Sequence, residues 1–190
     1  MHYPVVMITA VYAFVLCTAS AIPSIAPTNF TSPSGVQLLS YIRRNPRLSR
    51  EEFWDHWANE HAPMVVPLAL KFGITGYTQI RAFGEILPQD AGEDNPASNF
   101  PTSFDGIATF RYPNDTALEN MLAHPYYTKV VAVDEARFID QEAHNGGQVA
   151  VFISATYDVV GNHAPSRNVW NGDKAIKDYY EALFKKYDRL

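Results

Sequence analysis

A helix-forming segment rich in aromatic residues and histidines, residues 49–63 (SREEFWDHWANEHAP), constrains this chain more than any other part. Ser49 and Glu52 have the spacing of a capping box, in which each side chain satisfies a backbone donor that the first turn of a helix leaves free. A helix is therefore predicted to begin at about Ser49. Pro63 lacks a backbone donor and its ring would clash with the carbonyl four residues earlier, so the helix is expected to kink or restart just beyond His61.

The same helix has an apolar face that is expected to be buried. At about 100° per residue, that face contains Phe53, Trp57, Met64 and Leu68. His61 lies on its flank, together with Trp54, whereas His56 is five residues earlier and about 140° away around the helix, on the opposite flank. The pattern therefore predicts that His61 is closer to the core than His56.

The first 35 residues are expected to lie outside the folded domain. Residues 1–21 contain an apolar run that ends in small residues, a pattern typical of a signal peptide cleaved after Ala21. An uncleaved membrane anchor is the alternative, although the run is shorter than the ~20 residues that span a bilayer. Residues 22–35 contain three prolines and no periodicity, and are interpreted as an extended leader. The sequence thus predicts entry into the secretory pathway, with no stable membrane insertion after cleavage.

Cysteine usage and charge exclude several classes of protein. The single cysteine, Cys17, lies in the predicted signal peptide, so the processed chain would contain neither disulfides nor a cysteine-ligated metal. A net charge of −5 gives no indication of nucleic-acid binding. The sequons at Asn29 and Asn114 are predicted glycosylation sites of a secreted chain.

The order of predicted elements defines an α+β domain over residues 36–160. Strands are expected at 36–43, 74–83, 105–112 and 148–160. The first helix is expected from about Ser49, and a second helical region follows Asn114, is interrupted by Pro125 and resumes over 126–139. This β-α-β-β-α-β order predicts a ferredoxin-like fold, a four-stranded antiparallel sheet with both helices on one face. The opposite sheet face would then be buried by pairing with a second copy, which predicts a homodimer.

Two segments fall outside that plan. Residues 84–103 contain four acidic side chains and three prolines, and this long acidic loop is interpreted as a lid or, preferably, as a disordered insertion. Residues 161–190 are predicted to form a helical extension capped by Asp173. Its apolar side contains Ile176, Tyr179, Tyr180, Leu183 and Tyr187. This helix is expected to dock as an amphipathic arm on its own domain or on a partner.

Residues 41–63 (YIRRNPRLSREEFWDHWANEHAP) resemble the first strand and helix of the EthD-domain family, with its pattern S-x-E-E-F-x-x-H-W-x-x-x-H-x-P. His124-Pro125 and residues 134–138 (DEARF) resemble the second helical region of that family. The resemblance covers about residues 36–158. It implies a dimeric α+β barrel of ferredoxin-like protomers, each with a pocket between sheet and helices.

The resemblance also implies a class of chemistry. Similar fungal proteins accompany polyketide synthase clusters and act without a cofactor as dehydratases or decarboxylases on aromatic polyketides. Related barrels include cofactor-independent monooxygenases and a muconolactone isomerase. Since one fold serves several reactions, the resemblance defines the scaffold more narrowly than the reaction.

Loss of water from a β-hydroxy ketone, or of carbon dioxide from a β-keto acid, requires an acid or base that titrates near neutrality. His61 is the first candidate for this proton transfer and His56 the second. Asp134 could orient a histidine or act as the base, and His124 could face the same pocket. Two histidines five residues apart, without an evident third ligand, do not indicate a metal site.

Donors for an enolate oxygen are also needed, and Tyr41, Tyr77 and Arg81 are the candidates on strands. Tyr77 and Arg81 share one face of their strand, but the alternation does not show which face this is. Trp54 and Trp57 are expected mainly in the core, where they could also line a site for a flat aromatic ligand.

The sequence therefore predicts a secreted, cofactor-independent lyase, a dehydratase or decarboxylase, that acts on an aromatic polyketide. Its general acid/base would be His61. Two alternatives stay open: a cofactor-free oxygenase or cyclase of the same fold, and a non-catalytic secreted protein that binds hydrophobic phenolics.

Overall fold

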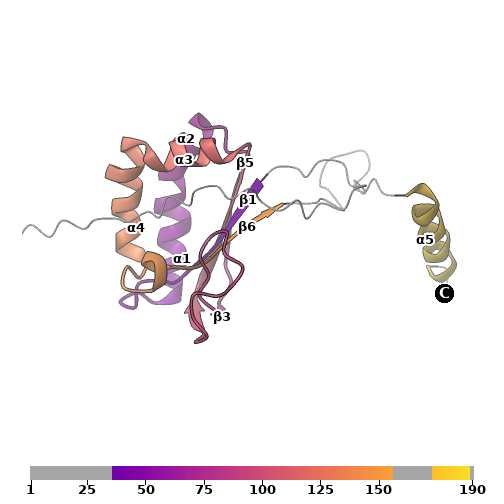
Figure 1. The fold of residues 1–190 in the computed structure, drawn as a ribbon, viewed down its shortest axis with the longest axis horizontal. Helices are drawn as coiled ribbons and strands as arrows, with labels where there is room; N and C mark the ends of the chain where they lie inside the picture. Colours follow the sequence, from indigo (N-terminus) through magenta and orange to yellow (C-terminus); the bar gives the residue numbers. More distant parts are fainter. Residues whose placement is uncertain (1–35, 156–172, 189–190) are drawn as a thin grey trace, which may run out of the picture.

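The computed structural model describes residues 36–155 and 173–188 (Figure 1). The predicted signal peptide and leader, the sequon at Asn29 and the end of the expected fourth strand lie outside these residues. Within the described ranges, no helix combines the length and apolar character needed to cross a membrane.

The elements follow the predicted β-α-β-β-α-β order, with each helical region divided into several pieces. They are β1 (Val36–Ile42), α1 (Arg50–His56), η1 (Trp57–His61), α2 (Ala62–Lys71), β2 (Gly76–Ile80), β3 (Gly84–Ile86), β4 (Thr102–Phe104), β5 (Gly106–Tyr112), α3 (Asp115–Ala123), η2 (Tyr127–Val131), α4 (Ala132–Phe138), η3 (His144–Gly147), β6 (Gln148–Ala155) and α5 (Lys174–Tyr187). The first helical region is α1, η1 and α2, and the second is η2 and α4, preceded by α3.

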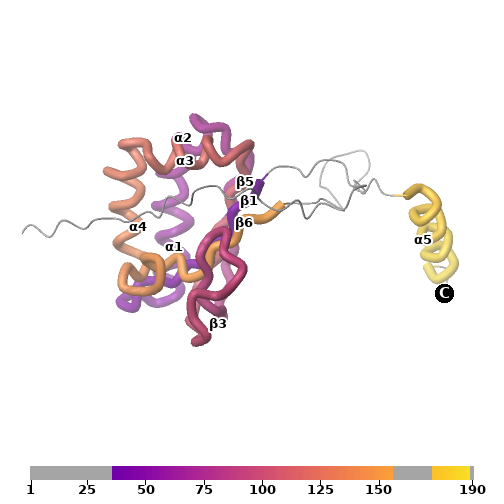
Figure 2. Tube along the Cα trace, viewed as in Figure 1, coloured from indigo at the N-terminus to yellow at the C-terminus, as the bar shows by residue number. Residues whose placement is uncertain are grey.

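The main sheet has four antiparallel strands in the order β2-β5-β1-β6, and the helical regions lie on one of its faces (Figure 1, Figure 2). This confirms the predicted ferredoxin-like fold. Phe110 pairs with both Leu38 and Tyr77, and these alternate positions face the helices. Leu39 pairs with Phe152 on the alternate set of positions, so both belong to the open face.

The helix start predicted at Ser49 is confirmed. Its hydroxyl accepts from the backbone N–H of Glu52 at 3.2 Å, and the Glu52 carboxylate accepts from the backbone N–H of Ser49 at 2.7 Å. The expected buried face is also found, since Phe53, Trp57 and Leu68 are at most 3% exposed. Local sequence therefore determined where this helix begins and which side it buries.

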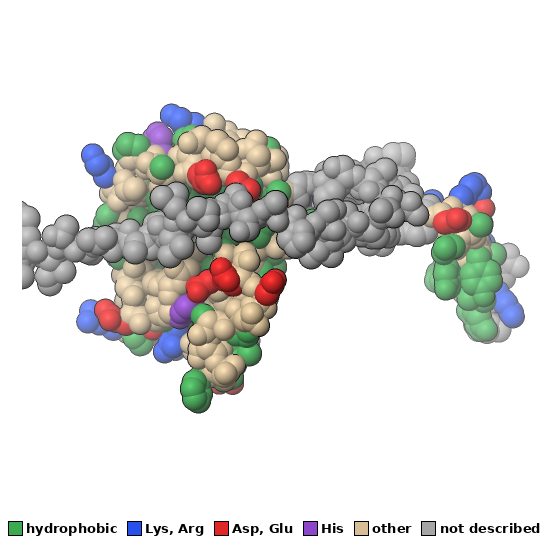
Figure 3. Space-filling view, viewed as in Figure 1, with side chains coloured by type: hydrophobic (Ala, Val, Ile, Leu, Met, Phe, Trp, Pro, Cys, Tyr) green, Lys and Arg blue, Asp and Glu red, His purple; other side chains and the backbone are tan. Residues whose placement is uncertain are grey.

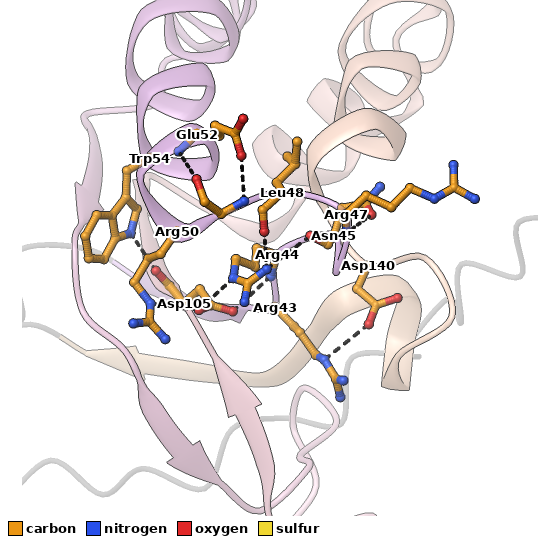
Figure 4. Close-up of polar contacts among 11 residues, drawn as sticks. Arg43, Arg44, Asn45, Arg47, Leu48, Arg50, Glu52, Trp54, Asp105 and Asp140 are labelled. Carbon is orange, nitrogen blue, oxygen red and sulfur yellow. Dashed lines mark hydrogen bonds and ion pairs between the residues drawn. The ribbon is translucent and has the colours of Figure 1, made fainter.

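A buried carboxylate anchors the first turn of α1 to the corner that precedes β5 (Figure 4). Asp105 Oδ1 lies 3.0 Å from Arg50 Nε and 3.3 Å from Arg44 Nε, while its backbone carbonyl accepts from Trp54 Nε1 at 2.6 Å. The guanidinium groups compensate for the loss of hydration of the carboxylate. The indole N–H of Trp54 thus has a structural role, because it connects α1 to this corner.

The segment expected to be a disordered insertion is instead a paired structure, so that interpretation is wrong. β3 pairs with β4, and the chain between them adds Gln89 to the free edge of β6 as a short parallel bridge to Ala150. The Gln89 backbone donates to Val149 and accepts from Val151, at 3.2 and 2.9 Å. An edge strand has unpaired backbone groups that can order such a segment, which composition alone does not reveal.

The C-terminal helix α5 forms as predicted, with the Asp173 carboxylate accepting from the backbone N–H of Ala175 and Ile176. Its large apolar side chains are gathered on one side (Figure 3) but are not buried. Those exposed by 51–65% are Ile176, Tyr179, Tyr180, Phe184 and Tyr187. Docking of this helix on its own domain is therefore not observed, and docking on a partner stays a prediction.

Close packing between the first helical region and β5 depends on a glycine. A Cβ atom on Gly106 would lie 2.5 Å from Cζ3 of Trp57 and 3.2 Å from Phe53. Both rings belong to the core cluster formed with Phe138 and Ile139. Any side chain at this position would therefore push the helix away from the sheet.

We expect Gly106→Ala to lower the free energy of unfolding by about 1–3 kcal/mol, because the added methyl overpacks the core against a rigid indole. Urea denaturation measures the change. Gly76→Ala is the matched control, since its Cβ would meet only Arg111 Cβ at an ordinary 3.4 Å. Equal stabilities of the two variants would contradict this account of the packing.

Candidate active site

Each helical region contains one π-helical turn, in which a backbone N–H bonds to the carbonyl five residues earlier. In the first, Ala62 donates to Trp57, and in the second, Ala132 donates to Tyr127. Gln79 from β2 also donates to the Trp57 carbonyl, at 2.9 Å. The helix thus continues past Pro63 by widening one turn, instead of breaking. Such turns are rare and are frequent at functional sites.

The wider turn places His56 and His61 on the same side of the helix. In a regular α-helix the two would lie about 140° apart, but a five-residue repeat aligns them. The prediction that helical geometry separates them is therefore wrong. His61 is buried, as expected, and His56 is its neighbour on the same side.

The Asp134 carboxylate of α4 joins both histidines across the helix pair. His56 Nε2 lies 3.0 Å from Oδ1, and His61 Nδ1 lies 3.1 Å from Oδ2. Arg137 Nη1, one turn further along α4, is 3.7 Å from Oδ1. The ring of Phe138 packs against both imidazoles, with centroids 5.0 and 4.9 Å away. The structure thus brings His56, His61 and Asp134, each named from sequence, together.

The bridge determines which nitrogen of each histidine holds a proton. An ionised carboxylate can only accept, so Nε2 of His56 and Nδ1 of His61 must be the donors. Burial lowers the pKa of His61, and the hydrogen bond and charge of Asp134 oppose that effect. His61 is therefore neutral at neutral pH, with Nε2 as its basic nitrogen.

A shallow cleft lies beside His56. It has a volume of about 360 Å³ and is lined by Leu48, Glu52, Asp55, His56, Glu60, Arg137 and Phe138. The His56 side chain is 17% exposed, whereas those of His61 and Asp134 are at most 5% exposed. His56 Nδ1 lies 3.4 Å from Glu60 Oε2 at the rim. His56 is thus the member of the histidine–aspartate set that solvent reaches.

A second polar group lies on the sheet side of α4. The Tyr127 hydroxyl donates to Glu135 Oε2 at 3.0 Å, and burial raises the pKa of Glu135 to about 7. The charge of Asp134 raises it further, and the hydrogen bond from Tyr127 opposes the shift. Burial likewise raises the pKa of Tyr77 to about 12.

Tyr77 lies on the helix-facing side of β2, which resolves the question that strand alternation left open. Its ring stacks on Phe110 with centroids 4.5 Å apart, and its hydroxyl accepts from Gln79 at 2.8 Å. Arg81 does not share this position, because β2 ends at Ile80 and Arg81 is exposed beyond it. Tyr77 thus lies between the sheet and the helices, whereas Arg81 lies outside that layer.

Three other candidates lie away from the histidine pair, and their predicted site roles stay predictions. Tyr41 is on the open sheet face, edge-on to Phe104 at 4.9 Å. Trp54 is engaged at the Asp105 corner. His124 follows α3, where Pro125 favours an extended backbone, and its ring packs against Phe72 at the end of α2, with centroids 5.6 Å apart.

The remaining predicted positions have structural roles in the described region. The side chain of Trp57 is 3% exposed and belongs to the core, and its backbone carbonyl accepts the hydrogen bond of the π turn. Asn114 is exposed and caps α3, accepting from the backbone N–H of Ala117 at 3.0 Å. Across the described ranges, no group of three or more His, Cys, Asp or Glu side chains is arranged to hold a metal ion.

Sequence reasoning missed Glu135 and Tyr127. Glu135 is adjacent to Asp134 in the sequence, but Tyr127 precedes Glu135 by eight positions. The two meet only because the intervening turn is widened. The available signal was a second carboxylate next to a candidate site residue, on the side of the helix that faces the sheet.

The fold and these contacts define a class of protein: a ferredoxin-like α+β protein with a buried carboxylate hydrogen-bonded to two histidines. A family profile for the EthD domain matches residues 45–142, and the chain belongs to that family.

Curated relatives are fungal. The chain is 32% identical over 99 residues to the dehydratase ustZ of Ustilaginoidea virens, covering 51% of this chain and 69% of the relative. It is 29% identical to the dehydratase aurZ of Gibberella zeae and 26% identical to the decarboxylase claH of Passalora fulva, each over 97 residues. These matches cover 51% of this chain and 64% and 63% of those relatives.

Two solved structures that are similar to this chain are also described as EthD proteins. An EthD family protein from Bacillus halodurans is 15% identical, with a TM-score of 0.37 over 64% of this chain and 96% of that one. An EthD-like protein from Ralstonia eutropha is 16% identical, with a TM-score of 0.37 over 66% and 94% of the two chains.

We expect Glu135→Gln to remove a pH-dependent loss of stability. The Glu135 carboxyl has an ordinary pKa of 4.5 in the unfolded chain and about 7 when folded, so the folded protein holds an extra proton between these values. The contribution of this group to stability therefore falls as pH rises from about 4.5 to 7, and stays lost above that.

Urea denaturation of both proteins between pH 4 and 9 tests this. Relative to the wild type, the free energy of unfolding of the variant should increase across that range. The increase should reach up to about 3 kcal/mol, and less where water screens the carboxyl. Glu119→Gln, on the exposed side of α3, is the matched control and should show no such trend. A difference between Glu135→Gln and wild type that does not vary with pH would refute the expectation.

Proposed function

We propose that this protein is a cofactor-independent lyase, a dehydratase or decarboxylase, acting on an aromatic polyketide intermediate. The observation that supports it best is the buried Asp134 carboxylate hydrogen-bonded to both His56 and His61. Membership of the EthD family and relatives named dehydratase or decarboxylase agree with this class of reaction. The substrate itself is part of the proposal.

In dehydration, the Nε2 atom of His61 would remove the proton next to the ketone. The electron pair of the C–H bond forms an enolate, whose collapse breaks the C–O bond and releases hydroxide, which leaves as water with a proton from an acid of the site. Asp134 would stabilise the imidazolium and hold its ring in position. Because the carboxylate is buried, this electrostatic effect is stronger than it would be in water.

In decarboxylation, the bond between the α carbon and the carboxylate of a β-keto acid breaks, carbon dioxide leaves, and the electron pair of that bond forms an enolate. A protonated histidine then delivers a proton to carbon. The Asp134 bridge serves both reactions because each one alternates between neutral imidazole and imidazolium. The apolar ring of Phe138, against both imidazoles, offers a surface for an aromatic substrate.

Turnover by wild type and variants tests this proposal. A convenient probe is the β-hydroxy ketone from aldol addition of acetone to a naphthaldehyde, because its dehydration product is a conjugated ketone that is followed by near-ultraviolet absorbance. We expect His61→Ala to lower kcat at least about 100-fold, since proton transfer contributes that much. Asp134→Asn should lower kcat by a similar factor because it removes the charge that stabilises the imidazolium.

His124→Ala is the matched control and should retain wild-type kcat, because His124 ends α3 and packs against Phe72, away from His56 and His61. Oxygen consumption during turnover would favour the oxygenase alternative. Undiminished affinity of His61→Ala for a naphthol, without turnover by the wild type, would favour the binding-protein alternative and refute the lyase.

We also propose that the protein is a homodimer paired through the open sheet face. Leu39, Tyr41 and Phe152 form an apolar strip there, and Phe152 and Ile80 are 38% and 42% exposed. Exposed apolar surface of this kind is typical of an interface between copies.

Light scattering after size-exclusion chromatography should therefore give the mass of two chains for the wild type. Phe152→Glu should give the mass of one, because a charge would be buried at the interface. Val133→Glu, on the exposed side of α4, is the matched control and should remain dimeric. A monomeric wild type would rule the dimer out.

A further inference from the structure

The C-terminal helix α5 has an apolar face that no other described part of the chain covers. At 100° per residue, its large apolar side chains span about 140° of the helix circumference. They are Ile176, Tyr179, Tyr180, Leu183, Phe184 and Tyr187. All except Leu183 are more than half exposed (Figure 3). Exposed apolar surface that is gathered in this way marks a contact with a partner or a membrane.

Lysines border this apolar face on both of its long edges. Lys177 lies about 20° beyond Phe184, and Lys186 lies about 20° beyond Tyr179 on the opposite edge. The ammonium of Lys186 is 5.6 Å from the ring centroid of Tyr187. The face therefore combines an apolar centre with a positive charge along each edge.

The acidic side chains of α5 lie on the other side of the helix. Asp178 and Glu181 form ion pairs there with Lys174 and Lys177, each one turn away. Among the described residues, no carboxylate forms an ion pair with Lys186. When the apolar face meets a surface, the lysines at its edges therefore point toward that surface, and the carboxylates point away from it.

This distribution of charge and apolar area is complementary to an anionic lipid surface. A helix with aromatic residues on one face and lysines beside them lies in the plane of a bilayer interface. The long lysine side chains reach the headgroups, and tyrosine rings favour the same level of the bilayer. α5 has 14 residues, a length of about 21 Å, and is not among helices long and apolar enough to cross a membrane.

We propose that α5 docks the protein on anionic lipid surfaces, with its apolar face against the bilayer and Lys177 and Lys186 beside the headgroup phosphates. The dimer proposed above pairs the open sheet faces and assigns no contact to α5. This proposal does not rest on the lyase function, because none of the residues that carry it belongs to the histidine–aspartate set.

Hydrogen exchange of the full chain, followed by mass spectrometry, tests the proposal because it reports on residues 174–187 separately from the apolar N-terminal segment. Vesicles of phosphatidylcholine and phosphatidylserine, in a ratio of about two to one, should slow exchange of the α5 amides. The physical reason is that a helix held against lipid opens less often. Vesicles of phosphatidylcholine alone should slow it much less. No slowing by the mixed vesicles, or equal slowing by both kinds, would overturn the proposal.

A charge placed in the apolar face should prevent docking. Phe184→Glu should abolish the slowing of exchange, because its carboxylate would have to enter the bilayer interface and faces anionic headgroups. Val133→Glu is the matched control, since Val133 of α4 is also more than half exposed but lies outside α5. Slowing that survives in Phe184→Glu, or that is lost in Val133→Glu, would contradict the assignment to this face.

Two adjacent lysines test the orientation of the docked helix. Lys186→Gln should weaken binding to the mixed vesicles about fivefold, because a lysine near an anionic surface contributes about that factor. Lys185→Gln is the matched control and should have a smaller effect. Lys185 lies about 100° further around the helix, on the side of the carboxylates, at about one Debye length from the lipid. Equal effects of the two changes would refute the orientation.

A second copy of the chain is the other surface that could cover α5, and the same measurement detects it. Exchange of the α5 amides that slows without vesicles, as the protein concentration rises, would show that α5 docks on another copy and would overturn the lipid proposal. Turnover of the naphthyl β-hydroxy ketone is measured without vesicles, so the result for the lyase is independent of these outcomes.

Discussion

The carboxylate of Asp134, buried between the imidazoles of His56 and His61, joins the two helical regions at the centre of their contact. Removing the carboxylate or an imidazole would leave a buried polar group without its hydrogen bond. The resulting loss of stability is larger than the net contribution of the bond itself. The same contact fixes the tautomers of both histidines, and so makes the basic nitrogen of His61 available for chemistry. Packing and proposed reactivity therefore depend on one interaction.

Both helical regions depart from regular α-helical geometry, and each departure accompanies a contact of one carboxyl group of α4. In the first, the π turn at Trp57–His61 brings His56 and His61 to one side, and the Gln79 side chain satisfies the Trp57 carbonyl that this turn shares. In the second, the π turn at Tyr127–Val131 brings Tyr127 to Glu135. Two widened turns thus serve the two sides of α4, one for each carboxyl group.

Beyond this centre, Asp105 stabilises the end of the sheet. Its carboxylate forms ion pairs with Arg44 and Arg50 beneath the first turn of α1. Gly106, the next residue, allows Trp57 to pack directly on β5. The inserted segment adds Gln89 to the edge of β6, and Asp90 pairs with His144 at 2.9 Å. These contacts leave the apolar strip of the opposite sheet face for the proposed second copy.

The sequence by itself determined the start of α1, its buried face, the order of elements and the family, because caps and periodicity are local properties that neighbouring residues encode. It also named His56, His61 and Asp134, but not how they meet. Tertiary structure decided how these residues meet, because the π turn is stabilised by the side chain of Gln79 from a strand. The periodicity of the helix sequence does not predict such a turn. It also placed Tyr41 on the far face, ordered the insertion through the edge of β6, and brought Glu135 into contact with Tyr127. Each of these depends on which surfaces pack together, and only the folded chain brings those surfaces into contact.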